Sequence, residues 1–242
     1  MDNVIRHGRI ELAAALRWAA RVGLHEGVCN HFSLAVSDDG RRFLVNPWGR
    51  HFAEATASEM VLVDVDGTVT EGDGPPEPTA FFIHGRIHAN VPRARCVLHT
   101  HMPHATALTS VQGGRLEMVT QNALRFYGRV AYDDDYNGLA LDEAEGDRLA
   151  ALLGDRDVLF LANHGVIVAG GSVAEAFDDL YYLERACQNQ VLAMSTGRPL
   201  KYVPDEIARR ACPLMAEDRT QAGLHFEAIR RVLDREEPGY AA

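Results

Sequence analysis

The chain has 242 residues, of which 47% are hydrophobic and 24% are charged, and its formal net charge is −10. This length suits one sizeable α/β core, and the composition is that of a soluble globular protein. The negative charge and the lack of any basic block argue against nucleic acid or an anionic membrane surface as a partner.

The four cysteines lie far apart and form no CxxC pair, which indicates free thiols rather than a disulfide framework. No run approaches the ~18 apolar residues that span a bilayer, and the N-terminus lacks the pattern of a signal peptide. We therefore expect a cytoplasmic protein. Because no repeat or change of composition divides the chain, we expect a single domain over 1–242, with a core at about 9–200 and a helical tail at 204–242.

The elements expected in the first part of the chain mix helices with hairpins. Apolar residues at helical spacing predict helices, alternating ones predict strands, and Asp-Gly turns predict hairpins. In chain order these are a helix over 9–22, a hairpin over 31–47, a second hairpin over 60–72, and a helix over 79–90 with Thr79 as its N-cap.

The later part of the chain follows the same rules. Ser172 and Glu175 form a predicted capping box that opens the longest helix. The expected elements are a strand over 95–101, a helix from Pro103, a helix over 142–153, buried strands over 158–162 and 165–170, the long helix to about Met194, and one or two helices within 204–233.

The segment RCVLHTH, residues 95–101, ends in two histidines. Side chains two apart in a strand point the same way, so His99 and His101 project together. Paired imidazoles at a strand end are costly unless their nitrogens are used, and a divalent metal is the commonest user. His164 follows another apolar strand and precedes a glycine, where a turn can aim its ring inward. We predict that these three histidines hold one metal ion with an open position, as in catalytic sites.

A second histidine pair, His84 and His88, lies four residues apart on one predicted helix. This is the spacing of a helical metal pair, but the glutamate of an HExxH motif is missing. A buried hydrogen-bonding role near the site is the alternative interpretation for His84.

The HTH and NHG segments, together with CNHFS (29–33), NPWG (46–49) and ASEMVLVD (57–64), resemble the class II aldolase/adducin family. The resemblance implies a three-layer α/β/α sandwich with a mixed, mostly antiparallel central sheet. It also implies a homotetramer with active sites where subunits meet, and metal binding by the three histidines named above. We expect zinc as the metal, with manganese or iron as alternatives.

One departure from the family concerns the proton donor. The sugar-phosphate aldolases that the chain resembles carry an acid/base glutamate where this sequence has Ala80, and alanine cannot move a proton. Decarboxylation needs only a donor after the bond breaks, so it suffers less from this loss. Candidate catalytic donors are Tyr127, Tyr132 and Glu77, with Tyr136 and a metal-bound water as further options.

A second departure concerns the phosphate pocket of those aldolases. His31, Trp48 and the Pro-Thr pair ending at Thr79 replace the family's asparagine, threonine and serine pair, and Gly49 is retained. We infer that the substrate is not a sugar phosphate and that these four residues line the substrate site. Arg125 is a further candidate, since it can pair with a substrate carboxylate.

The predicted function is that of a divalent-metal-dependent lyase, of aldolase or decarboxylase type, on a small unphosphorylated hydroxy- or keto-acid. The alternatives are a non-catalytic adducin-like binding or scaffold domain, or an iron-dependent oxygenase on the same fold. Metal identity separates them, because three nitrogen ligands alone do not select a metal.

Overall fold

The computed structural model describes residues 2–216 and 219–242, and its centre is an eight-stranded sheet in the order β4-β3-β2-β1-β5-β8-β7-β6. The strands are β1 His31–Ala35, β2 Arg42–Val45, β3 Val61–Asp64, β4 Val69–Glu71, β5 Cys96–Thr100, β6 Val130–Asp133, β7 Val158–Leu161 and β8 Gly165–Gly170. Neighbouring strands are antiparallel except β6 and β7, which run parallel. The mixed, mostly antiparallel sheet is therefore confirmed.

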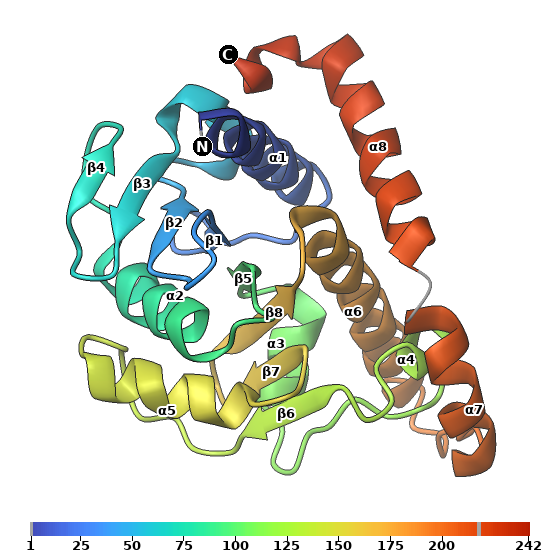
Figure 1. Ribbon diagram of the computed structural model, residues 1–242. Coiled ribbons are helices and arrows are strands. Elements are labelled where there is room, and N and C mark those ends of the chain that lie inside the picture. Colours follow the sequence, from blue (N-terminus) through green and yellow to red (C-terminus); the bar gives the residue numbers. More distant parts are fainter. Residues whose placement is uncertain (1, 217–218) are drawn as a thin grey trace.

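Helices cover both faces of this sheet, which makes three layers (Figure 1). α2 and α5 lie on one face, and α1 and α6 lie on the other, with α8 packed outside them. The helices are α1 Asp2–Arg21, α2 Pro78–Asn90, α3 Pro103–Thr109, α4 Gln121–Leu124, α5 Glu143–Leu153, α6 Val173–Met194, α7 Asp205–Ala216 and α8 Arg219–Glu236, with 3-10 turns η1 Phe52–Glu54, η2 Ala57–Glu59 and η3 Pro238–Ala241. Within the described residues, no helix is both long and apolar enough to cross a membrane.

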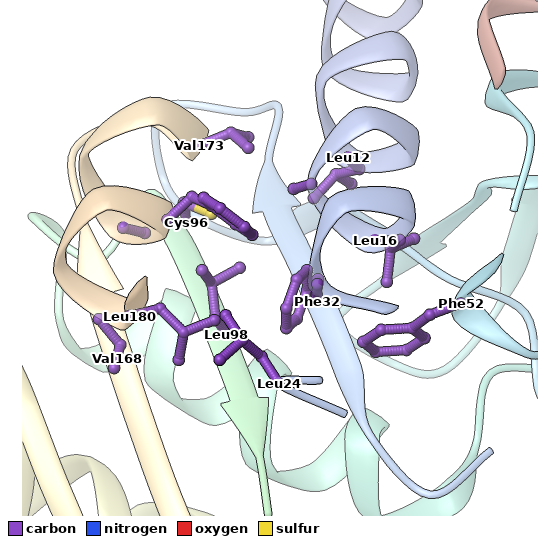
Figure 2. Close-up of a cluster of buried hydrophobic side chains, with 14 of the residues drawn as sticks. Leu12, Leu16, Leu24, Phe32, Phe52, Cys96, Leu98, Val168, Val173 and Leu180 are labelled. Atoms are coloured by element: carbon purple, nitrogen blue, oxygen red, sulfur yellow. The ribbon is translucent and has the colours of Figure 1, made fainter. Parts of the chain in front are cut away.

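The alternation of side chains along each strand gives the two layers separate apolar cores. Leu98 of β5 and Phe32 of β1 point toward α1 and α6, where they meet Leu12 and Leu180 (Figure 2). Val97, which precedes Leu98 on β5, points to the other face and packs with residues of α2 and α5. Each such buried side chain contributes about 1.5–3 kcal/mol. The same alternation places the odd-numbered residues of β1 and β5 on the α2 face.

Three local predictions differ from the structure. α1 begins at Asp2 rather than residue 9, because Ile5 is also buried and extends the apolar stripe. Thr79 does not cap α2, because the Glu77 carboxylate accepts from the backbone N–H of Ala80 and is the N-cap. Ser172 caps α6 as predicted, but the carboxylate of Glu175 accepts from the N–H of the preceding glycine instead of closing a capping box.

Candidate metal centre

The three predicted ligands converge at one end of the sheet. One ring nitrogen from each of His99, His101 and His164 can be chosen so that all lie within 4.8 Å of one another. The ring centroids are separated by 4.8 to 5.0 Å. Within the described ranges, these are the histidine, cysteine and acidic side chains that lie close enough to share an ion. His84 and His88 are not among them.

Strand pairing explains how a residue 65 positions away joins the pair on β5. β8 runs antiparallel to β5, with Val166 opposite Thr100, so the turn before β8 lies beside the end of β5. Asn163 in that turn has a left-handed φ of 55°. Gly165 is required after His164, because a Cβ there would lie 2.5 Å from the backbone oxygen of Thr100. The NHG sequence is therefore what lets the ring approach the site.

Hydrogen bonds from Nδ1 orient the rings of His99 and His101 so that their Nε2 atoms point toward each other. His99 donates from Nδ1 to the backbone oxygen of Val166 at 3.0 Å, and His101 donates from Nδ1 to the Glu26 carboxylate at 2.7 Å. In a neutral ring this leaves Nε2 unprotonated. The two Nε2 atoms lie 3.2 Å apart, so two lone pairs face each other. A shared cation relieves that repulsion, and the donor set fits a divalent metal.

The protonation of the rings also suits a metal. Burial, and then the nearby His31 and His164, hold the pKa of His99 well below its usual range. Burial and the neighbouring His101 lower the pKa of His164 to about 4. These imidazoles are therefore neutral at physiological pH, which is the form that binds metal.

A cavity of about 280 Å³ opens onto the three imidazoles. Apolar side chains form much of its wall, including Val28, Trp48, Ile83 and Leu139. Among the described residues that line it, none is a lysine or an arginine. The cavity therefore presents metal-ready nitrogens and a carboxylate, from Glu77, but no cationic side chain.

Of the five predicted substrate-binding residues, three line this cavity, Gly49 is adjacent in sequence to one of them, and Arg125 is not in its wall. His31, Trp48 and Thr79 lie in its wall. Gly49 follows Trp48 in a turn with a φ of 76°, a conformation that suits glycine. Trp48 is 57% exposed and so stands at the mouth rather than filling the interior.

Glu77, a predicted catalytic donor, also lines the cavity, and its carboxylate accepts from the Thr79 hydroxyl and the Ala80 N–H. Burial opposes its ionisation, but the adjacent His31 ring, and then hydrogen bonds from the Thr79 hydroxyl and the Ala80 amide, lower the pKa of Glu77 to about 2. Glu77 is therefore a carboxylate at neutral pH. Ala80 itself is buried in an apolar cluster with Val45 and Val63 and does not line the cavity.

The two tyrosines predicted as donors do not line the cavity of their own chain. The Tyr127 hydroxyl donates to Asp205 of α7 at 2.6 Å. The Tyr132 hydroxyl accepts from the backbone N–H of Leu116 at 3.1 Å, and burial raises the pKa of Tyr132 to about 12. Tyr136 lies closer, with its ring centroid 6.3 Å from that of His164. A catalytic role for Tyr127 or Tyr132 stays a prediction that the geometry of one chain does not support.

Arg125 also lies away from the cavity. Its guanidinium forms an ion pair with the buried Asp178 of α6, and it stacks 4.1 Å over the Tyr182 ring. Pairing with a substrate carboxylate would break this buried ion pair, so within one chain Arg125 serves the packing of α4 on α6.

Sequence reasoning missed Glu26, the partner of His101. It lies in an irregular segment before β1, where no periodicity marks an acidic residue as functional. Leu139 and Ile83 of the cavity wall were missed for a similar reason, because single apolar residues carry no signal of a ligand site.

Comparisons with known proteins agree with this fold. Residues 10–191 match the family described as Class II Aldolase and Adducin N-terminal domain. The chain is 36% identical to an aldolase II superfamily protein from Pseudomonas syringae, with a TM-score of 0.91 over 98% of this chain and 96% of that one. It is 26% identical to the L-fuculose 1-phosphate aldolase from Glaciozyma antarctica PI12, with a TM-score of 0.82 over 97% and 92% of the two chains.

The adducins form a second group of relatives. The chain is 34% identical to human beta-adducin over 221 residues, which cover 84% of this chain and 30% of that protein. The matched family spans most of the sheet and its covering helices, including all three imidazoles. The chain therefore belongs to the class II aldolase and adducin family.

Proposed function

We propose that this protein is a divalent-metal-dependent carbon–carbon lyase, of aldolase or decarboxylase type, that acts on a small unphosphorylated hydroxy- or keto-acid. The observation that carries the proposal is the trio His99, His101 and His164, whose ring nitrogens converge on an open cavity. We propose zinc as the ion held by these three rings, which when bound supplies a Lewis acid for substrate oxygens.

The remaining cavity residues define what this site accepts. The apolar wall limits water at the reacting carbon, and His31, Glu77 and Thr79 add polar groups to the same cavity. A phosphate dianion would meet the Glu77 carboxylate and no lysine or arginine among the described lining residues. Repulsion from Glu77 is stronger for this dianion than for the single negative charge of a hydroxy- or keto-acid, so the site favours an unphosphorylated substrate.

We extend the proposal to a single-domain subunit of a cytoplasmic homotetramer. The exposure of Trp48 and Leu139 at the cavity mouth, 57% and 67%, supports a neighbouring subunit that completes the site. The absence of Tyr127 and Tyr132 from the cavity of their own chain agrees with a proton donor from elsewhere. The four cysteines are free thiols, as expected in a reducing compartment.

The test begins with elemental analysis of untagged protein. The zinc-loaded protein is then assayed with 2-hydroxy, 3-hydroxy and 2-keto acids for release of carbon dioxide or an aldehyde. We expect His101→Ala to lose both metal and turnover, and His7→Ala to keep both, because His7 is exposed and pairs only with Glu11 among the described residues. Full metal occupancy in His101→Ala, or turnover of fuculose 1-phosphate at about 1 per second or more, would contradict the proposal.

An adducin-like binding domain is the second candidate. It is favoured by the alanine at position 80 and by the 34% identity to beta-adducin. Protein that retains no metal after gentle purification, and turns over no acid in the screen, would support it. Iron in place of zinc would point instead to an oxygenase.

A further inference from the structure

A line of polar contacts runs from the cavity through the interior to the end of α2, and from His31 onward these contacts are hydrogen bonds. It joins Glu77, His31, His84, Ser33 and His88, in that order. The last four are at most 3% exposed. Buried polar groups are almost always hydrogen-bonded, so the direction of each bond in this line can be worked out from its fixed end.

The fixed end is a backbone carbonyl, which can only accept. His88 Nδ1 lies 2.7 Å from the backbone oxygen of Ala94, so this nitrogen carries a hydrogen. Burial lowers the pKa of His88 to about 4, so the ring is neutral and its Nε2 accepts. Ser33 Oγ lies 2.7 Å from that Nε2 and 3.4 Å from the backbone oxygen of Val97, so its one hydrogen goes to the shorter bond with His88.

The same reasoning assigns the donor and the acceptor in the bonds made by the next two rings. Ser33 has no second hydrogen, so His84 Nδ1, 2.5 Å from Oγ, is the donor in that bond. Burial holds the pKa of His84 well below its usual range, which leaves its Nε2 to accept from His31 Nδ1 at 3.2 Å. One carbonyl thus places the hydrogen on Nδ1 in all three rings.

At the cavity the line ends with two acceptors side by side. His31 Nε2 lies 3.4 Å from Glu77 Oε2. That oxygen already accepts from the Thr79 hydroxyl and the Ala80 N–H. A charged N–H···O⁻ bond is about 2.7–2.9 Å long, so the separation argues against a proton held between the two groups. Both groups face the cavity that the three imidazoles share.

We propose that His31 Nε2 and the Glu77 carboxylate form an acceptor pair for a hydroxyl hydrogen of the substrate, with Ser33, His84 and His88 as positioning residues. The inference builds on the proposed lyase function and narrows its substrate to a hydroxy acid. A keto oxygen has no hydrogen to donate, so a keto acid leaves both buried acceptors unpaired. Sites built around such a hydrogen bond reject the analogue that lacks it.

The first test reads the hydrogen positions directly. In zinc-loaded protein labelled with ¹⁵N-histidine, long-range ¹H–¹⁵N spectra distinguish the two neutral tautomers and the charged ring. We expect the Nδ1–H form in His31, His84 and His88. A hydrogen on Nε2 of His31, in either a neutral or a charged ring, overturns the inference whatever becomes of the lyase assignment.

The second test compares lactate with pyruvate, which differ in the hydroxyl, by calorimetry on the zinc-loaded protein. We expect lactate to bind at least about tenfold more tightly. Glu77→Gln should reduce this preference to within about threefold, because the amide nitrogen donates to His31 Nε2 and takes the place of the substrate hydroxyl. Ser33→Ala should also reduce the preference for lactate, because it removes the hydrogen bonds that join His84 to His88 through Ser33.

Glu227→Gln on α8 is the matched control, since this exposed carboxylate pairs with Arg231 and neither residue lines the cavity. It should leave the preference unchanged. Equal or tighter binding of pyruvate by the unmodified protein overturns the hydroxyl inference alone. Failure of both acids to bind contradicts the hydroxyl inference and the lyase proposal together.

Discussion

Glu26 is the side chain through which the metal centre can be weakened without touching a ligand. Its carboxylate accepts from the Nδ1–H of His101 at 2.7 Å and thereby selects the tautomer of the neutral ring whose Nε2 is the metal-binding atom. Partners of this kind are worth about 10- to 100-fold in metal affinity. Because the Glu26 side chain is 68% exposed, solvent screening places the effect at the low end. We expect Glu26→Ala to raise the zinc Kd about tenfold, which equals about 1.4 kcal/mol.

The assay is a zinc titration in competition with a chromophoric chelator. The loop should persist in the variant, because the bond from Glu26 to Asn30 Oδ1 uses the backbone N–H. Glu54→Ala is the control for loss of an exposed carboxylate, since Glu54 bonds to the backbone of His51 and not to a ring of the metal centre. An unchanged Kd in Glu26→Ala would mean that His101 is not a ligand, or that its tautomer is set in another way. A loss of 1,000-fold or more would indicate that Glu26 itself binds the metal.

Three further predictions concern α2 and the cavity mouth. Burial lowers the pKa of His88 from 6.5 to about 4, so its stabilising contribution is complete above pH 6.5 and is lost as the pH falls toward 4; at pH 5 the loss is about 2 kcal/mol. Urea unfolding at pH 7 and pH 5 gives the free energy of unfolding at each pH. Its fall between the two should be smaller by about that amount in His88→Gln than in the unmodified protein, and an equal fall would contradict this. Ala80→Glu should lower the free energy of unfolding by about 2 kcal/mol or more without tightening zinc binding, because the new carboxylate enters an apolar cluster; tighter zinc binding in the titration would show that the side chain reaches the site instead. Trp48→Ala should raise KM about three- to tenfold with kcat nearly unchanged, since a half-exposed indole at the mouth binds substrate without reaching the reacting atoms; a large fall in kcat alone would place it in the chemistry.

The convergence of the three imidazoles was predictable because two strict local patterns encode it. The two-residue period of a strand puts His99 and His101 on one side, and the glycine after His164 permits the close approach that β5 and β8 require. Both patterns depend on neighbours in sequence. The pairing of β5 with β8, which joins them, was available only through the resemblance to a family.

The tyrosines and Arg125 were harder to place because residues 114–140 have no hydrophobic period. The partners of Arg125 and Tyr127 lie on α6 and α7, more than 50 residues further along the chain, so tertiary packing decides where each polar end is satisfied. The same holds for Glu26, whose role depends on a ring 75 residues away. Polar side chains in irregular segments have many possible partners, and sequence spacing does not choose among them.

The sequence contains the two spacings from which the buried line between β1 and the α2 histidines is built. His31 and Ser33 alternate along β1, and His84 and His88 are four apart on α2. What the sequence does not state is that these two faces pack together, and that packing turns separate polar residues into one connected set. A partial set would have been worse than an apolar core, since each unpaired buried group costs about 1–3 kcal/mol.

The register of the sheet couples this line to the metal centre. His31 pairs with His99 across β1 and β5, and their rings stack with centroids 5.1 Å apart. Ser33 pairs with Val97, two residues further along the two strands. A shift of β1 by one residue would turn His31 to the opposite face and remove both the ring contact and the hydrogen bond to His84. Because apolar side chains of similar volume would fill the same space at equal or lower cost, the polar line is best explained by what it holds at its cavity end.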